Sequence, residues 1–140
     1  MADFSWNSRK SFRVQFDTKA AFRLNRHSKK EVRLKEKTVN THLLDLGAGG
    51  CALESPHFLP VGVKINIFFD RNMLLPAGAA AKKKNIVRAV GVIRTSRQSP
   101  NHQYRFGIQF ERISAQDVQL IRDFVDRFER REEKRITFPT

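Results

Sequence analysis

Hydrophobic and β-branched residues alternate with polar residues along most of the chain up to about residue 111. This spacing is typical of strands that bury one face. Short polar connections at residues 27–31 and 98–101 predict that the strands flanking each of them form a hairpin. The expected strands are residues 20–26, 32–44, 51–55, 61–69, 86–94 and 104–110, with Val63, Ile65 and Ile67 on one face.

Residues 70–85 interrupt the strand pattern, because a polar run is followed by a small, apolar run and then by three lysines. We expect an extended excursion between two strands. A short helix over residues 79–83 is the alternative, although Pro76 and Gly78 limit it.

The hydrophobic period changes to that of a helix after Ser114, which is placed to cap its first turn with Asp117 three residues on. Residues 132–140 are rich in charge and are expected to form a tail. Strands first and one amphipathic helix last favour an antiparallel sheet, closed or half-closed as a small barrel, with the helix against it. The apolar stripe of this helix comprises Val118, Leu120, Ile121, Phe124, Val125 and Phe128.

The chain has 140 residues, enough for one domain with a real core, and carries a formal net charge of +13. So large a positive charge predicts attraction to an anionic partner. Nucleotides, nucleic acids, membrane surfaces and acidic protein faces all remain candidates on this ground alone.

Catalytic and metal-binding patterns find little support. Cys51 is the only cysteine, it lies where an inward-facing strand residue is expected, and the four histidines lack the spacing of metal ligands. The first twenty residues contain no sustained apolar run, and no segment is apolar enough to span a membrane. We therefore expect a cytoplasmic protein without membrane insertion, with no metal, no cofactor and no enzymatic activity.

Two separated motifs carry the most information about function. Residues 9–13 read Arg-Lys-Ser-Phe-Arg, and residues 45–50 read Asp-Leu-Gly-Ala-Gly-Gly. Paired arginines can donate to phosphate or to the O6/N7 edge of guanine, and a carboxylate can accept from guanine N1 and N2. Together they predict a guanine nucleotide site, although Arg-x-x-x-Arg alone also occurs by chance at Arg127/Arg131.

These motifs, followed by Phe-Gly-Ile-Gln-Phe at residues 106–110, resemble the PilZ domain over about residues 8–128. The resemblance implies a mainly β fold, a six-stranded antiparallel β-barrel with a C-terminal α-helix. It also implies a bacterial receptor for cyclic di-GMP. The expected organisation is an N-terminal arm over residues 1–13, one domain over residues 14–131 and the charged tail.

The resemblance implies that Arg9 and Arg13 match the first ligand-binding motif of the family, and that Asp45 and Gly50 match the second. Gly47 stands where the family pattern has serine. Loss of that hydroxyl is expected to cost about 1 kcal/mol, roughly a fivefold change in affinity. Lys10 and Gly49 are secondary candidates for ligand contact, and Asp45 could instead pair with a neighbouring arginine.

The expected function is that of a cyclic di-GMP receptor whose N-terminal arm changes on ligand binding and which signals through an unidentified protein effector. One alternative is a degenerate domain that acts as a ligand-independent protein adaptor. A basic single-stranded nucleic-acid-binding barrel is less favoured, because most phenylalanines fit buried patterns and leave few rings for stacking. Those assigned to the core are Phe22, Phe68, Phe106, Phe110, Phe124 and Phe128.

Overall fold

The computed structural model of the chain describes residues 14–26, 38–76, 78–79 and 85–136. Six strands, one 3₁₀ helix and one long α-helix follow one another in this part of the chain. They are β1 (Val14–Leu24), β2 (Val39–Gly47), β3 (Gly50–Ser55), β4 (Lys64–Asp70), η2 (Arg71–Leu74), β5 (Ile86–Ser99), β6 (Gln103–Arg112) and α2 (Ala115–Ile136).

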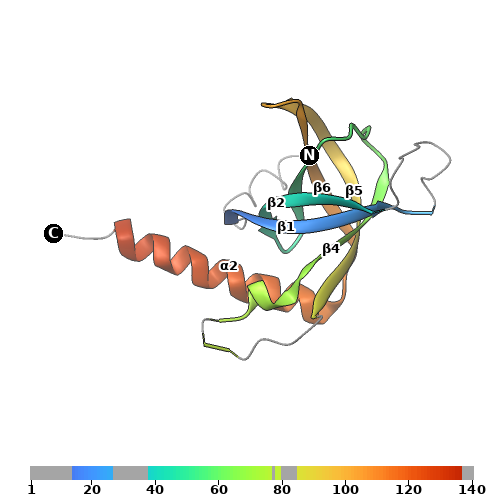
Figure 1. Cartoon of the computed structure of the whole chain (residues 1–140). Coiled ribbons are helices and arrows are strands. Elements are labelled where there is room, and N and C mark those ends of the chain that lie inside the picture. The colour runs from blue at the N-terminus through green and yellow to red at the C-terminus, as the bar shows by residue number, and fades with distance from the viewer. Residues whose placement is uncertain (1–13, 27–37, 77, 80–84, 137–140) are drawn as a thin grey trace, which may run out of the picture.

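The six strands form a closed antiparallel barrel in the order β1-β2-β3-β6-β5-β4. In this order β3 lies across the barrel from β4, so β2, β3 and β6 form one side and β1, β4 and β5 the other. Helix α2 runs beneath the barrel in Figure 1, and its second half extends beyond the strands. The predicted six-stranded barrel with a C-terminal helix is confirmed.

The strand boundaries differ from prediction mainly at the start of the chain. Strand β1 begins at Val14 rather than at residue 20 and pairs with both β2 and β4. Polar residues at its outward positions weakened the hydrophobic signal there. The pairing of β1 with β2 and of β5 with β6 agrees with the two predicted hairpins.

The expectation of an extended excursion over residues 70–85 is wrong at its start, where Arg71–Leu74 form η2. The side chain of Asp70 accepts a hydrogen bond from the backbone N–H of Asn72 at 2.9 Å, and Leu74 is fully buried. A capped turn with one buried residue therefore replaces extended chain. The helix considered over residues 79–83 lies largely outside the described residues.

Inward-facing side chains of all six strands fill the barrel, as the alternation predicted, and Cys51 is among them. Phe22 and Phe106 are fully buried, whereas Phe68 is not a core residue. Its neighbours Ile67 and Phe69 are buried, and the alternation along β4 places Phe68 on the outer face of the barrel.

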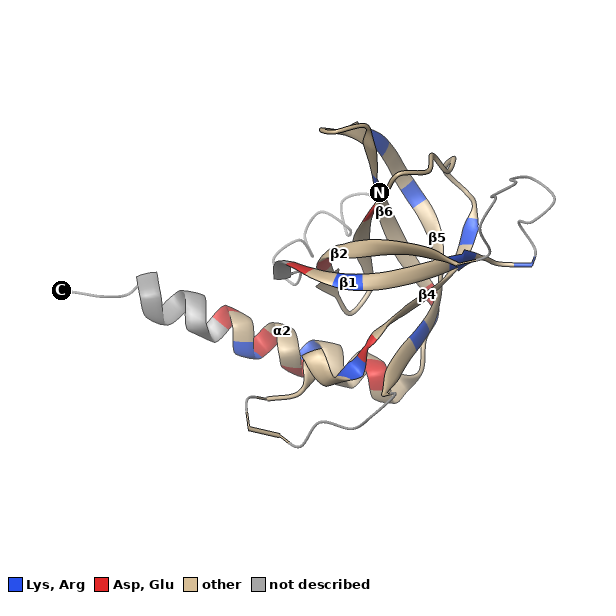
Figure 2. Cartoon of the chain, viewed as in Figure 1, with Lys and Arg blue, Asp and Glu red and all other residues tan. Residues whose placement is uncertain are grey.

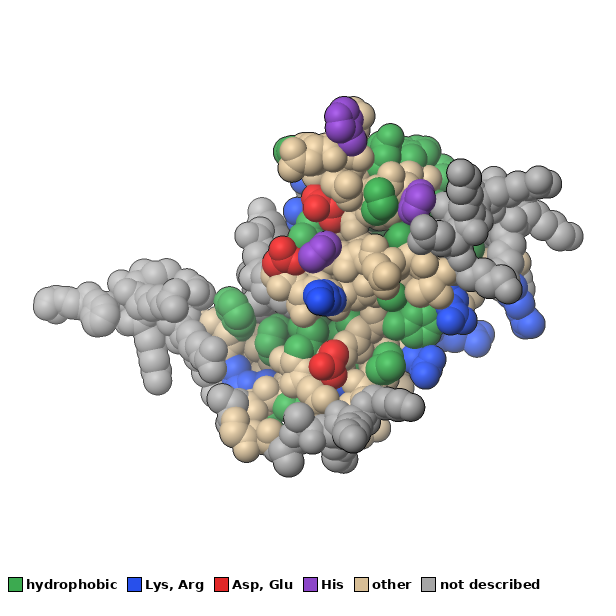
Figure 3. All heavy atoms as spheres, viewed as in Figure 1, with side chains coloured by type: hydrophobic (Ala, Val, Ile, Leu, Met, Phe, Trp, Pro, Cys, Tyr) green, Lys and Arg blue, Asp and Glu red, His purple; other side chains and the backbone are tan. Residues whose placement is uncertain are grey.

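Helix α2 packs on the barrel through the predicted stripe, with Ile121 and Val125 buried. Hydrophobic side chains lie along the contact between barrel and helix in Figure 3. The Ser114 hydroxyl accepts a hydrogen bond from the backbone N–H of Asp117 at 3.1 Å, which confirms the cap. The helix continues to Ile136, beyond the expected domain end at residue 131, so the first part of the proposed tail is helical.

An ion pair fastens the first turn of α2 to η2. The Arg71 guanidinium donates to both carboxylate oxygens of Asp117, at 2.7 and 3.1 Å, and also to the side-chain oxygen of Asn85. The Asp117 side chain is only 4% exposed. Charged residues of both signs meet at this junction in Figure 2. Further along the helix, Arg127 donates to the backbone carbonyl of Leu74.

The stability of the protein should therefore fall in acid. The hydrogen bonds from Arg71 lower the pKa of Asp117 below its ordinary value of 3.8, despite desolvation, which raises it. The resulting stabilisation is complete above about pH 5 and is lost as the pH falls through the lowered folded-state pKa. Chemical denaturation between about pH 7 and pH 3 should show a smaller loss of unfolding free energy in Asp117→Asn than in the wild type. Equal losses in the two proteins would contradict this assignment.

Candidate functional site

The predicted glycine-rich motif forms the tight turn between β2 and β3. Gly47 and Gly50 pair across the two strands, leaving Ala48 and Gly49 as the connection. The backbone N–H of Phe110 donates to the carbonyl of Gly49 at 2.9 Å, which ties the turn to β6. Gly49 has no left-handed φ, and a Cβ added to it would meet no atom within 4 Å. Neither a left-handed φ nor close packing within the described part of the chain therefore requires glycine at position 49.

A β-bulge sets the direction of Asp45. Val39, Thr41 and Leu43 are buried at alternate positions of β2, and simple continuation would bury position 45 in the barrel. The register shifts between Leu43 and Asp45, so Leu46 fills the next inward position. A bulge adds one residue and reverses the alternation that follows. Asp45 consequently belongs to the outer face of the barrel.

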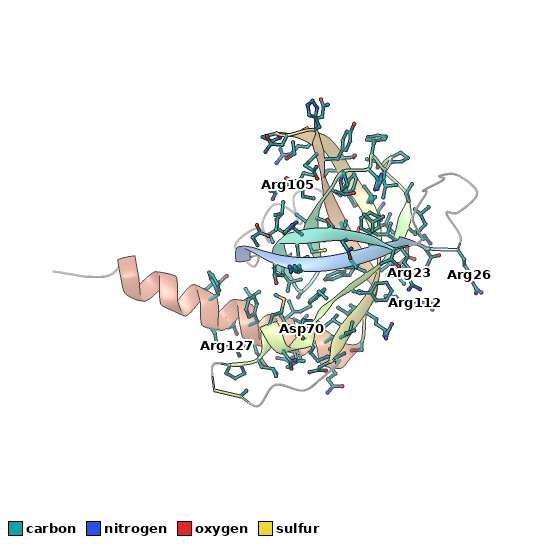
Figure 4. The ribbon with its side chains drawn as sticks, in the orientation of Figure 1. Arg23, Arg26, Asp70, Arg105, Arg112 and Arg127 are labelled. Atoms are coloured by element: carbon teal, nitrogen blue, oxygen red, sulfur yellow. The ribbon has the colours of Figure 1, made fainter. Side chains whose placement is uncertain are left out.

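Arg105 of β6 reaches Asp45 across β3. Its guanidinium Nη2 lies 3.3 Å from the Asp45 Oδ2 atom, and the two side chains are 32% and 11% exposed. Figure 4 shows Arg105 in the upper part of the barrel, away from Arg127 beside α2. The alternative in which Asp45 pairs with an arginine thus occurs in this structure. Arg105 carries no signal in the sequence, because no local pattern links two residues sixty positions apart.

A row of small residues continues from Asp45 across the outer face. Asp45 is opposite Ala52 of β3, and Ala52 is opposite Gly107 of β6. The Gly107 backbone N–H donates to the Thr95 hydroxyl at 3.0 Å, and a Cβ at Gly107 would lie 2.3 Å from that oxygen. A close approach therefore requires glycine here. Ala52 and Asp45 are nevertheless both buried, at 2% and 8% exposure.

The arginine motif at residues 9–13 directly precedes β1 in the sequence. Arg9, Lys10 and Arg13 lie outside the described residues, but β1 begins at the next position, Val14. Val14 is the Cα partner of Leu46, and Gln15 is the partner of Asp45. The strand that follows the arginine motif therefore enters the barrel directly beside the second motif.

Other functional groups are sparse in the described part of the chain. His42 and Asp17 form an exposed pair at 2.8 Å. No three histidine, cysteine, aspartate or glutamate residues among those described are grouped to hold a metal ion. Within the same residues, no helix has the length and apolar character needed to cross a membrane.

Bacterial proteins of known structure contain the same arrangement of barrel and helix. The Bacillus subtilis inhibitor of motility MotI/DgrA superposes with a TM-score of 0.65 at 14% identity, over 86% of this chain and 51% of that one. YcgR from Escherichia coli, solved in complex with c-di-GMP, gives a TM-score of 0.55 at 15% identity. The match covers 89% of this chain and 47% of that one. The PilZ domain of YcgR with c-di-GMP gives a TM-score of 0.52 at 14% identity. The match covers 89% of this chain and 93% of that one.

These likenesses define the chain as a PilZ-type barrel by fold. The family model for the PilZ domain matches residues 7–127, and the chain belongs to this family. It spans about half the length of the MotI/DgrA and YcgR chains. A search of curated proteins by sequence gives no significant match.

Proposed function

We propose that this PilZ domain is a receptor for cyclic di-GMP and has no enzymatic activity of its own. The proposal rests mainly on the position of β1, which begins beside the β2–β3 turn. Its first residues, Val14 and Gln15, pair with Leu46 and Asp45. Arg13 is bonded to Val14, the first residue of β1. The YcgR relatives of similar fold were solved with the same ligand.

The chemistry of the site suits the two halves of the ligand. Arg9 and Arg13 would bind phosphate and the O6/N7 edge of guanine through planar, bidentate hydrogen bonds. Asp45 would accept hydrogen bonds from guanine N1 and N2, in place of part of its contact with Arg105. Ala52 and Gly107, in register beside Asp45, are small residues. Gly50, Gly49 and Lys10 remain candidates for further contacts.

The proposal is tested by calorimetric titration of the protein with cyclic di-GMP at physiological salt, with GTP as the control. Saturable binding of cyclic di-GMP and none of GTP is expected. Absence of binding to either nucleotide would overturn the receptor function. Gly47 would then mark a degenerate site in a domain that acts as a protein adaptor.

Ligand binding is proposed to hold residues 1–13 against the β2–β3 turn and thereby change the surface offered to a protein effector. Limited proteolysis by trypsin should then cut at Arg9 and Arg13 more slowly when cyclic di-GMP is present. Cleavage at Arg127, on the helix, serves as the internal control and should be unaffected. Equal cleavage rates at the arm with and without ligand would contradict the change.

The expectation of a cytoplasmic protein stays a prediction.

Gly47→Ser should tighten cyclic di-GMP binding about fivefold, because a hydroxyl would add one neutral hydrogen bond worth about 1 kcal/mol. Position 47 follows Asp45 by two residues on the same strand, so the two side chains face the same side of the sheet. Gly47→Ala adds the Cβ without the hydroxyl and is the matched control. Equal affinities of the two variants would show that the hydroxyl contributes nothing.

A further inference from the structure

The outer face of β1, β4 and β5, together with the last residue of β6, carries a group of arginines. Arg23, Asn66, Val90 and Arg112 form one cross-strand row. In the neighbouring row Phe68 is opposite Arg88. Arg23, Arg88 and Arg112 are all exposed. Figure 4 shows Arg23 and Arg112 at the same side of the barrel, and we refer to Arg23, Phe68, Arg88 and Arg112 as the basic face.

Phe68 holds two of these arginines in place. The Arg23 Cζ atom is 5.7 Å from the centroid of the Phe68 ring, and the Arg88 Cζ atom is 5.5 Å from it. Arg23 also donates through Nε to the Thr38 hydroxyl at 2.9 Å. These contacts restrict two long side chains before any partner arrives, which lowers the entropy lost on binding.

Two arginines of the basic face have no carboxylate partner among the described residues. Neither Arg23 nor Arg88 forms a salt bridge there. Glu111 pairs with Lys64, and Asp70 accepts a hydrogen bond from the backbone N–H of Asn72. The face therefore presents positive charge outward, and Figure 3 shows Lys and Arg side chains gathered at this side of the barrel.

We propose that the basic face is a docking surface for the acidic surface of a protein partner, bound through bidentate arginine–carboxylate pairs. Held arginines are typical of residues that dominate protein interfaces. The Arg23 and Arg88 guanidinium groups already contact the Phe68 ring, so a single-stranded base would have to compete with them to stack on it. The face also lacks a fully exposed aromatic anchor of the kind that inserts into a membrane surface. This inference does not depend on nucleotide binding.

The test measures binding of fluorescent poly-L-glutamate to the whole chain, without nucleotide, at several salt concentrations. The variant Arg23→Gln/Arg88→Gln is compared with Arg97→Gln/Arg122→Gln, which removes the same charge from exposed positions elsewhere. The first variant should raise the Kd at least about tenfold and the second less than about twofold. Only the first variant removes the guanidinium groups that contact Phe68 and are proposed to bind the carboxylates. Thermal unfolding checks that both variants fold.

Phe68→Leu keeps the net charge and removes the ring that holds the guanidinium groups. It should also raise the Kd, and an unchanged Kd would contradict the role of the ring. Equal weakening by the two double variants would overturn the basic face as a site. Duplex DNA and phosphatidylglycerol vesicles are titrated in parallel. A larger effect of Arg23→Gln/Arg88→Gln on either of them than on poly-L-glutamate would overturn the choice of a protein partner.

Discussion

Arg13→Ala is expected to weaken binding of cyclic di-GMP by about thirtyfold or more. An arginine that is desolvated against phosphate or guanine contributes about 2 kcal/mol or more through charge-assisted hydrogen bonds. Position 13 directly precedes β1, the strand that pairs with the Asp45 segment. Calorimetric titration of variant and wild type at the same salt concentration measures the difference.

Two further variants give this experiment its controls. Arg131→Ala removes the same charge from another Arg-x-x-x-Arg run of the sequence and should leave the affinity within about twofold of the wild type. Arg13→Lys keeps the charge and loses the planar pair of donors, so it should fall between the wild type and Arg13→Ala. Comparable losses in Arg13→Ala and Arg131→Ala would mean that net charge, and not a site, attracts the nucleotide.

Arg71→Ala is expected to lower the free energy of unfolding by about 3 kcal/mol, since it leaves a buried carboxylate without its cation. The Asp117 side chain is 4% exposed and the Arg71 side chain 27% exposed. Because Arg71 is partly exposed, the expected loss of unfolding free energy is at the lower end of the range for breaking a buried ion pair. The contact joins η2 to the first turn of α2, so the helix should also dock less firmly. Urea denaturation followed by circular dichroism measures the change.

A double-mutant cycle separates the cost of leaving the Asp117 charge unpaired from the cost of losing the packing of the Arg71 side chain. Arg71→Ala/Asp117→Asn should be more stable than Arg71→Ala alone, because the amide is uncharged and costs less to bury. Arg94→Ala serves as the control for an exposed arginine, and should change stability by less than about 1 kcal/mol. An effect of Arg71→Ala as small as that of Arg94→Ala would show that the ion pair does not stabilise the junction.

Sequence periodicity predicted the elements that bury one continuous face. The alternation of Val63, Ile65 and Ile67 and the helical stripe around Ile121 both match buried surfaces of the structure. Periodicity failed at β1, where polar outward residues hid a strand that pairing with β2 and β4 revealed. The assignment of Phe68 to the core was wrong because the alternation through Ile65 and Ile67 continues to Phe69.

The proposed ligand site was predictable only where its residues are close in sequence. The two short motifs identified Arg9, Arg13 and Asp45 as candidates, because the spacing of donors and acceptors within a motif is a local property. Arg105 and Gly107 carry no such local signal. Their relation to Asp45 depends on β3 lying between β2 and β6, which brings together residues about sixty positions apart.

The sequence by itself determined the strand and helix class, the positive charge and the two motifs, because these depend on local periodicity and residue chemistry. Only the tertiary structure decided that Asp45 faces outward, since this depends on the bulge beside Leu43 and on the register with β3. A shift of one residue reverses which face of a strand every later side chain occupies. Barrel closure likewise decided that Arg23, Phe68 and Arg88, from three different strands, share one face.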